Sequence, residues 1–324
     1  MCIIYLISEQ TKLRQAGGRF LLEKKGRRVS SIPMDAVECV VQGKLAEITT
    51  PAIYELLARD ISVFFVDGRG RLLGQLGSTN VSWERSHIQY VNFNNEKKQL
   101  ELIRYIIRSK MDGQIKILRY YAKNKKDMEL AYFADEVRKY RKKLMTTFKP
   151  NELRGLEGMA SRKYFAGFPL ILNQRLWEWN GRNRRPSEDP VNALLSYGYA
   201  FLERDVRLAI LGSKLDARIG FLHSNNGRKD SLVYDMMEPF RQLVIDRLVL
   251  KMLNRGQFHL KDFSYDDTLG CRINEKAREI WINCYEEMMQ KPCQEYEGLS
   301  PREWIRNWIH QFATELFRNA ISAV

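Results

Sequence analysis

The spacing of apolar residues changes near residue 97, and this change limits the fold more than any other feature of the 324-residue chain. Before it, apolar residues stand in short runs separated by turn signals such as Ala16-Gly17-Gly18 and Asp67-Gly68-Arg69-Gly70, a pattern typical of β-strands. The runs cover residues 3–7, 20–22, 37–41, 61–66 and 72–76. We therefore predict a small β-rich domain over residues 1–84.

After residue 97 the apolar residues recur every three or four positions, which is the period of one buried helix face. The first stripe comprises Leu100, Ile103, Ile107, Met111, Ile115 and Leu118. Similar stripes over residues 195–211, 233–253 and 304–321 predict further helices. The fold class expected from both patterns is α+β, with the β-rich domain followed by a larger all-α domain over residues 97–324.

Residues 85–96 join the two regions and end in the polar run NFNNEKK, so we predict a linker there. One short helix should interrupt the strands, with Thr50 as its N-cap and Pro51 as its first residue, where the missing N–H costs nothing. The stretch GRGRLLG lacks the following helix and the glycine spacing of a phosphate-binding loop. A hairpin turn is the better interpretation of it.

Composition argues against membrane and secreted classes. The longest apolar runs fall far short of the ~20 residues of a membrane span, and the start MCIIYLISEQ lacks the basic leader and cleavage site of a signal peptide. The five cysteines form no CxxC pair and are odd in number, which argues against a zinc knuckle and a disulfide framework. We expect a soluble, cytoplasmic protein that has no membrane partner.

The positive charge is concentrated in one part of the chain. The chain carries 53 Lys and Arg against 39 Asp and Glu, a net charge of +14. Residues 97–185 alone hold 23 basic and 9 acidic residues, an excess equal to that of the whole chain. Any single basic cluster is most simply a solvated helix face, but the segment as a whole favours a nucleic acid, because each phosphate contact releases counterions.

The stretch from Gly220 to Leu250 sets His223 upstream of two carboxylates, Asp235 and Glu238, that lie among apolar residues. Two acids three residues apart project from one helix face, and Pro239 either kinks that helix or begins a new one. Ionised carboxylates in such a setting need a positive partner, which can be a metal, an arginine or a lysine. Taken alone, a histidine such as His223 is more often a hydrogen-bonded structural residue than a ligand, and the acids could cap a helix or pair with Arg241 or Arg247.

A metal site requires a further ligand, and the segment NELRGLEGMASRKYF offers Glu157. Its small and apolar neighbours are typical of a site residue, although an exposed helix acid paired with an arginine explains it as well. A set of carboxylates with one imidazole suits Mg²⁺ or Mn²⁺ better than a structural zinc ion.

The blocks LRGLEG, DPVNALLSYGY, GFLH and SLVYDMMEPFR occur here in an order and spacing that resembles the CRISPR-associated endonuclease and integrase of spacer acquisition, CRISPR-associated protein one. Three stretches of the N-terminal half are similar as well: IPMDAVECVVQG, ITTPAIYELLARDISVFFVDGRGRLLG and IIRSKMDGQIKILRYY. One departure is visible at Glu238-Pro239-Phe240-Arg241-Gln242, where the family often has EEFRP. The departure puts the local helix geometry in question but not the acid.

The resemblance implies a catalytic set of Glu157, His223, Asp235 and Glu238. Glu157, His223 and Glu238 match the family's ligands for Mg²⁺ or Mn²⁺, while Asp235 matches a residue that either binds the metal or orients water. Asn192 matches a recurring position of supporting character. The implied reaction joins the 3′ hydroxyl of captured spacer DNA to the CRISPR repeat by transesterification, with a metal easing attack and departure.

The implied partners are double-stranded DNA, a second copy of the chain bound through the β-rich domain, and the small ferredoxin-like CRISPR-associated protein two. Basic residues near the acids are candidate phosphate contacts: Arg154, Arg162, Lys163 and Arg241, with Arg182, Arg184 and Arg185 further along the duplex. Two other functions stay open, namely a stand-alone nuclease for branched DNA and a non-catalytic DNA-binding scaffold whose acids serve only in salt bridges.

Overall fold

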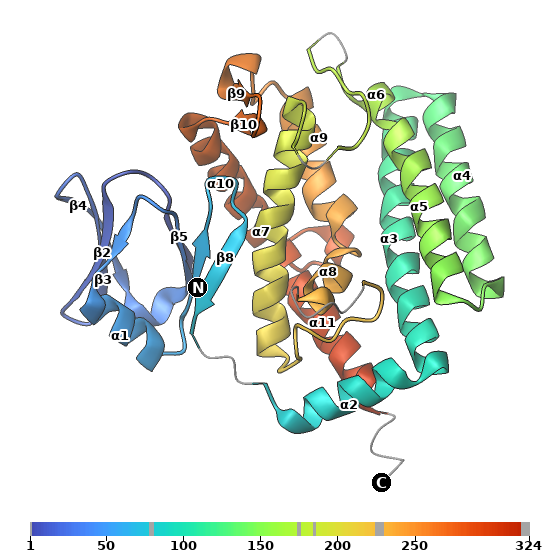
Figure 1. Ribbon diagram of the computed structural model, residues 1–324. Helices are drawn as coiled ribbons and strands as arrows, with labels where there is room; N and C mark the ends of the chain where they lie inside the picture. Colours follow the sequence, from blue (N-terminus) through green and yellow to red (C-terminus); the bar gives the residue numbers. More distant parts are fainter. Residues whose placement is uncertain (1, 78–80, 174–175, 184–185, 224–229, 319–324) are drawn as a thin grey trace. The chain divides into compact units, whose positions relative to one another are not determined.

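The computed structural model describes residues 2–77, 81–173, 176–183, 186–223 and 230–318 (Figure 1). The chain divides into two compact units, residues 1–80 and 81–324. The first is rich in strands and the second is mostly helical, which confirms the predicted α+β class. Among the described helices, none is long and apolar enough to cross a bilayer.

Two four-stranded sheets build the N-terminal unit. One has the order β1-β5-β7-β8, in which β1 (Cys2–Leu6), β5 (Val37–Gln42) and β7 (Ser62–Val66) are parallel and β8 (Leu72–Leu76) pairs antiparallel with β7. The other has the order β4-β3-β2-β6, with β2 at Thr11–Ala16, β3 at Arg19–Lys24, β4 at Arg27–Pro33 and β6 at Glu47–Ile48. Leu6, Leu13 and Phe20 are fully buried in one core with Leu56 of helix α1 (Thr50–Ala58).

The predicted hairpin at Asp67–Gly70 is present between β7 and β8, where the Gly70 N–H donates to the Asp67 carbonyl at 2.9 Å. The N-cap of α1 is Thr49, one residue before the predicted Thr50, and Pro51 lies in the first turn. Strands β2, β4 and β6 have no counterpart in the sequence prediction. Their sequences, TKLRQA, RRVSSIP and EI, are too polar or too short to stand out as apolar runs.

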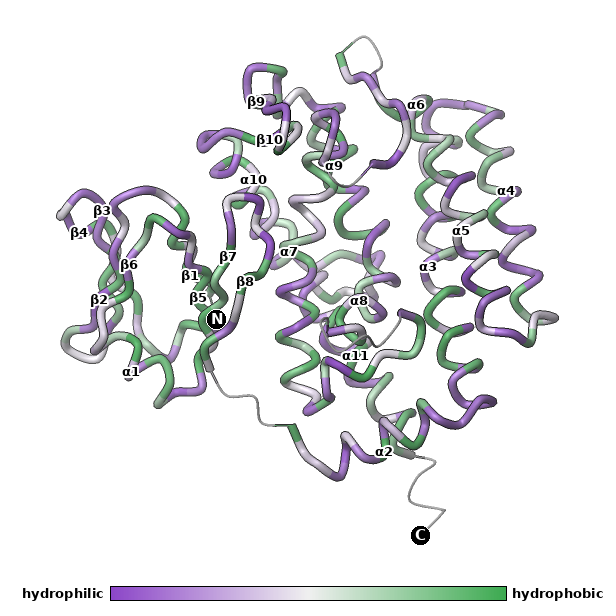
Figure 2. Tube along the Cα trace, viewed as in Figure 1, coloured by the Kyte–Doolittle hydropathy of each residue, from purple (hydrophilic) through white to green (hydrophobic). Residues whose placement is uncertain are grey.

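The helical unit begins with α2 (Trp83–Asn94), α3 (Glu96–Lys125), α4 (Met128–Lys143), α5 (Pro150–Ala166) and α6 (Phe168–Ile171). It continues with α7 (Pro190–Gly212), α8 (Ser231–Met237), α9 (Arg247–Asn254), α10 (Glu275–Gln290) and α11 (Pro301–Arg318). Figure 1 shows α3, α4 and α5 packed side by side, with α7 and α11 crossing the other half of the unit. The long helices carry hydrophobic and hydrophilic residues in alternation, as amphipathic helices do (Figure 2).

The linker prediction for residues 85–96 is wrong, because most of them form α2. Ser82 caps this helix by accepting from the Arg85 N–H at 3.4 Å. The buried anchor of α2 is polar: the Gln89 side chain donates to the carbonyls of Asp216 at 2.9 Å and Ile219 at 2.7 Å. A glutamine in that role leaves no apolar stripe for a sequence pattern to detect.

The helical unit also contains a two-stranded hairpin, β9 (Phe263–Asp266) and β10 (Gly270–Ile273), so it is not purely α. Around Pro239 the chain takes the first of the two predicted courses, a break in the helix. Helix α8 ends at Met237, and the helix resumes as the π-helical segment η3 (Arg241–Asp246), which leads directly into α9. Helical bulges of this kind occur often at functional sites.

Candidate active site

Asp235 lies on α8 and is completely buried. Its carboxylate accepts backbone hydrogen bonds from Phe221 at 2.5 Å, Leu222 at 2.9 Å and His223 at 2.9 Å. A Cβ at Gly220 would lie 2.9 Å from the Asp235 carboxylate and 2.7 Å from the Ser231 carbonyl carbon, so only glycine fits there. The 220–223 segment is therefore wrapped around one carboxylate, whose removal would leave three amide donors unsatisfied.

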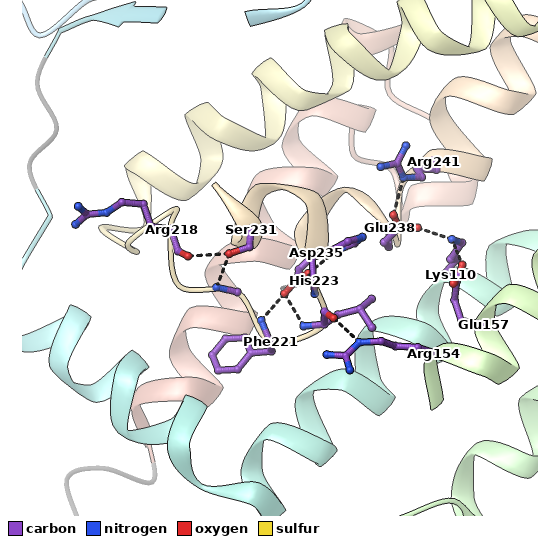
Figure 3. Close-up of polar contacts among 12 residues, drawn as sticks. Lys110, Arg154, Glu157, Arg218, Phe221, His223, Ser231, Asp235, Glu238 and Arg241 are labelled. Atoms are coloured by element: carbon purple, nitrogen blue, oxygen red, sulfur yellow. Dashed lines mark hydrogen bonds and ion pairs between the residues drawn. The ribbon is translucent and has the colours of Figure 1, made fainter. Parts of the chain in front are cut away.

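The His223 ring is oriented by the same carboxylate (Figure 3). Its Nδ1 lies 2.6 Å from Asp235 Oδ1, and its side chain is 43% exposed. Because the carboxylate accepts, Nδ1 carries the proton of this contact and the ring is held with Nε2 on its other side. From α5, Arg154 Nε donates to the Leu222 carbonyl at 2.8 Å and fixes the segment from the other side. The result is an accessible, oriented nitrogen that can bind a metal or accept a proton.

Glu157 of α5 and Glu238 at the end of α8 converge on one ammonium group, that of Lys110 on α3 (Figure 3). Lys110 Nζ lies 2.6 Å from Glu238 Oε2 and is in direct contact with Glu157 Oε1. Ser161, one turn along α5, donates to Glu157 Oε1 at 2.9 Å, and Arg241 Nε donates to Glu238 Oε1 at 2.8 Å. The two acids, 81 positions apart in sequence, thus share a single cation.

The acidic and basic side chains around Lys110 stabilise one another in their charged forms. Burial raises the pKa of the Glu238 carboxyl, but Arg241 and Lys110 outweigh it and hold that pKa well below its usual range. Burial lowers the pKa of Lys110, and the charges of Glu238 and Glu157 more than offset this, so the Lys110 pKa is raised. Lys110 and Glu238 are therefore both ionised at neutral pH.

Asp246 forms a second buried carboxylate, at the end of η3. It accepts hydrogen bonds from the hydroxyls of Tyr199 at 2.6 Å and Tyr164 at 2.9 Å, and burial raises its pKa to about 6. The Arg241 guanidinium lies 4.5 Å from the centre of the Tyr199 ring. Asp246 thus fixes the aromatic ring on which Arg241 rests, and Arg241 in turn positions Glu238.

The donors suit a divalent cation, although no group of three His, Cys, Asp or Glu side chains in the described part of the chain is close enough to hold one. Lys110 occupies the position between Glu157 and Glu238 that a cation would take. Glu238 Oε2 is buried and lies 2.6 Å from the Lys110 ammonium, whose charge offsets its own. Carboxylate oxygens with one imidazole are the donor types of a Mg²⁺ or Mn²⁺ site.

The candidate phosphate contacts differ in their surroundings. Arg154 is held by the Leu222 carbonyl, and Lys163 lies 3.8 Å from Glu136 of α4. Arg241 is buried against Glu238, so its guanidinium is not presented to solvent in this conformation. Arg162 is exposed.

Arg182 is anchored by Asn192 Oδ1 at 2.7 Å and Ser196 Oγ at 3.1 Å. Asn192 also donates to the Gly181 carbonyl at 2.9 Å, so it fixes the loop before α7, and its supporting role at the site stays a prediction. Arg184 and Arg185 lie outside the described residues. The nucleic-acid role of all these basic residues stays a prediction.

Sequence reasoning missed Lys110 and Asp246. A signal for Lys110 was available, since it lies with Gln114 on the buried face of α3, between Ile107 and Ile117. A lysine on an apolar stripe requires a buried anion. Asp246 gave a similar signal, since it stands between Ile245 and Leu248 in an apolar run, but its partners Tyr164 and Tyr199 come from helices far away in sequence.

Comparison with known proteins gives a consistent result. A family model described as CRISPR associated protein Cas1 matches residues 4–287. The chain is similar to the CRISPR-associated endonuclease Cas1 1 of Thermus thermophilus, with 31% identity over 286 residues, which are 88% of this chain and 86% of that relative.

Solved structures share the fold. A CAS1 protein from Thermotoga maritima has a TM-score of 0.84 at 25% identity, with 97% of each chain covered. A casposase bound to integration product has a TM-score of 0.86 at 22% identity, covering 98% of this chain and 91% of the casposase. A Cas6-RT-Cas1--Cas2 complex gives 0.81 at 23% identity, covering 98% of this chain and 35% of the other.

Proposed function

The chain belongs to the CRISPR-associated Cas1 family, and from this premise we propose that it is a metal-dependent DNA endonuclease and integrase of CRISPR adaptation. The observation that carries the proposal is the convergence of Glu157 and Glu238 on one cation, next to the His223 imidazole that Asp235 orients. The reaction we propose is attack by the 3′ hydroxyl of a captured DNA fragment on a phosphodiester of the repeat.

Glu157, His223 and Glu238 would hold Mg²⁺ or Mn²⁺, which when bound stabilises the negative charge that develops on the phosphoryl oxygens. Asp235 keeps the His223 segment folded and its Nε2 turned outward, so we assign it an orienting role rather than that of a ligand. Arg241 keeps Glu238 ionised. We assign two basic side chains of α5 to the DNA backbone. They are Arg162, which is exposed, and Arg154, which donates to the Leu222 carbonyl.

The proposed partners follow from the relatives. The printed titles describe a casposase bound to integration product and a complex that contains Cas1 and Cas2. By analogy we propose double-stranded DNA, a second copy of this chain and a Cas2 protein as partners, in the cytoplasm. The basic excess of residues 97–185 supports the DNA component.

The test is an integration assay with a supercoiled plasmid bearing the repeat, a DNA fragment with a free 3′ hydroxyl and the candidate Cas2 partner, in Mg²⁺ or Mn²⁺. Glu157→Gln, His223→Asn and Glu238→Gln should each lower fragment joining at least a hundredfold, and a chelator should abolish it in the wild type. Glu152→Gln is the matched control, since Glu152 lies on the same helix as Glu157 but its side chain is 56% exposed and pairs with the exposed Lys149 at 3.6 Å. Full joining by any of the three site variants would refute the assignment.

The scaffold function has one observation in its favour, because Glu157 and Glu238 do lie in salt bridges. It does not account for His223, whose ring is oriented by Asp235 although its side chain is 43% exposed. Thermal melting separates the two functions. A metal that binds the native state raises its stability, so an unchanged melting temperature in millimolar Mn²⁺ with DNA present would favour the scaffold.

A further inference from the structure

Two side chains of α3 meet two side chains of α5 at the same spacing. On the buried face of α3, Lys110 and Gln114 lie one helical turn apart. On α5, Glu157 and Ser161 are separated by the same four positions. Lys110 contacts Glu157 (Figure 3). Gln114 Nε2 donates to Ser161 Oγ at 3.1 Å. Since residues four apart project from one helix face, the contact between Gln114 and Ser161 lies directly beside the contact of the lysine with the acid.

The Ser161 hydroxyl has a single proton, which it directs to a carboxylate. A helical serine commonly donates to the backbone carbonyl four residues earlier, and for Ser161 that carbonyl belongs to Glu157. The hydroxyl donates instead to the side chain of the same residue, at 2.9 Å from Glu157 Oε1. Because Gln114 donates to the serine oxygen, the hydroxyl proton points away from Gln114 and is left for the carboxylate.

This hydrogen bond sets the direction of the Glu157 carboxylate. Each carboxylate oxygen has two lone pairs, and Glu157 Oε1 uses one for Ser161 and faces Lys110 with the other. Within the described part of the chain, Ser161 is the one neutral donor to this carboxylate. The Glu157 side chain is 25% exposed, so without Ser161 water competes for the same oxygen. Ser161 therefore keeps Glu157 turned toward the position between the two acids.

The buried position of Gln114 is not explained by packing alone. Gln114 is completely buried, and its Oε1 has no hydrogen-bond partner among the described residues. A buried carbonyl without a partner destabilises the fold. An apolar side chain of the same length would avoid that loss, so the amide is best explained by what its Nε2 does, which is to donate to Ser161.

We propose that Gln114 and Ser161 are positioning residues that hold the Glu157 carboxylate in the orientation in which it binds the divalent cation. The inference rests on the proposed function and adds two residues to the site. Gln114 acts through Ser161, and Ser161 acts through Glu157. Hydrogen-bond partners of metal ligands typically change metal affinity or activity by about 10–100-fold when they are removed.

The experiment measures the Mn²⁺ affinity of the full chain by calorimetry, with a DNA fragment that lacks the 3′ hydroxyl so that no joining occurs. Fragment joining is then followed across a Mn²⁺ titration. Ser161→Ala and Gln114→Met should each raise the Kd for Mn²⁺ about tenfold. The Mn²⁺ concentration for half-maximal joining should rise by the same factor, while the rate at saturating Mn²⁺ changes little. Ser161→Thr keeps the hydroxyl and should restore the affinity.

A double variant separates positioning through Ser161 from two independent structural contacts. Gln114→Met introduced into Ser161→Ala should lower the Mn²⁺ affinity no further, because its effect passes through the missing hydroxyl. In chelator, Gln114→Met should melt at or above the wild-type temperature, since methionine leaves no buried carbonyl unpaired. Ser109→Ala is the matched control. It removes a hydroxyl of α3 that donates to the Tyr105 carbonyl at 3.0 Å, and Mn²⁺ affinity should not change.

Three results would overturn the positioning role. They are an unchanged Mn²⁺ affinity in Ser161→Ala, additive losses of affinity in the double variant, and a lower melting temperature of Gln114→Met with unaltered affinity. A wild type that binds no Mn²⁺ in the presence of DNA refutes the proposed function. A wild type that binds Mn²⁺ and joins fragments, with both single variants unaffected, refutes the positioning role alone.

Discussion

Replacing Lys110 with methionine removes the ammonium group from between Glu157 and Glu238 while keeping a side chain of similar length. Lys110 and Glu238 have side chains that are 9% and 6% exposed, so the lost partner leaves a buried carboxylate undercompensated. Removing one member of a buried ion pair costs about 3–5 kcal/mol. Glu238 keeps Arg241 at 2.8 Å and Glu157 is 25% exposed, so the lower end applies.

The expected loss is therefore about 3 kcal/mol without metal, which lowers the melting temperature by roughly 6–12 °C for a unit of this size. Added Mn²⁺ should reverse much of this loss, because the variant has no ammonium to compete for the two carboxylates. A tenfold gain in Mn²⁺ affinity adds about 1.4 kcal/mol of stabilisation at saturating metal. The Mn²⁺-induced rise in melting temperature should thus be larger in Lys110→Met than in the wild type.

The assay is thermal melting with a chelator and then across a Mn²⁺ titration, paired with calorimetric measurement of Mn²⁺ affinity. Lys163→Met is the matched control, since this lysine has a side chain that is 34% exposed and lies 3.8 Å from Glu136. Such pairs contribute about 0–1 kcal/mol, and neither measurement should change much. A Lys110→Met variant with wild-type stability in chelator and an unaltered Mn²⁺ response would refute the placement of the cation between the acids.

Two further outcomes concern the buried surroundings of the site. Burial raises the pKa of Asp246 from 3.8 to about 6, so its protonated form stabilises the fold below about pH 4 and that contribution is lost as the pH rises through about 6. The Asp246→Asn side chain stays neutral, so its free energy of unfolding should rise by roughly 3 kcal/mol relative to that of the wild type between pH 4 and pH 7. Urea denaturation at several pH values measures this difference. A difference that does not change with pH would contradict the burial argument. Gly220→Ala should lower both stability and fragment joining, since its Cβ would lie 2.9 Å from Asp235 Oδ2. Gly155→Ala, whose Cβ meets nothing within 4 Å, should instead stabilise α5 by about 0.5–1 kcal/mol, and equal effects of the two changes on stability would argue against the close fit at Gly220.

The sequence predicted those elements whose buried side chains form either an apolar helix stripe or a short apolar run. The stripe from Ile103 to Leu118 became the buried face of α3, and the run over residues 61–66 became β7. Helix α2 escaped prediction because its buried contact is made by the amide of Gln89, and β2 and β4 because their exposed positions carry Arg and Lys. Hydrophobic periodicity detects apolar burial and has no means of detecting an element anchored by hydrogen bonds.

The acids of the site were predicted from a different argument. Charged residues that lie among apolar ones need a partner of opposite charge. That argument left metal, arginine and lysine open. The structure supplies the nearby arginine and also a lysine that the local sequence could not select. Arg241 is three residues from Glu238, but Lys110 comes from a helix more than a hundred residues earlier. A partner brought in by tertiary packing carries no local signal, so the sequence could indicate the need for a cation without identifying it.

The lysine between the two acids would be a permanent ion-pair partner in a scaffold protein, but it would hold the place of the metal ion in a metal-dependent enzyme. The surroundings of the two carboxylates bear on this choice. In a structural ion pair the remaining lone pairs are satisfied by hydrogen bonds, because an unsatisfied buried carboxylate is costly. Here the buried Glu238 Oε2 faces the Lys110 ammonium at 2.6 Å, while the Glu157 side chain stays 25% exposed. On the proposed function, we expect a divalent cation bound by the same oxygens to replace the ammonium without unfolding the protein. The arrangement therefore fits a site that keeps its two acids converged until metal and DNA arrive together.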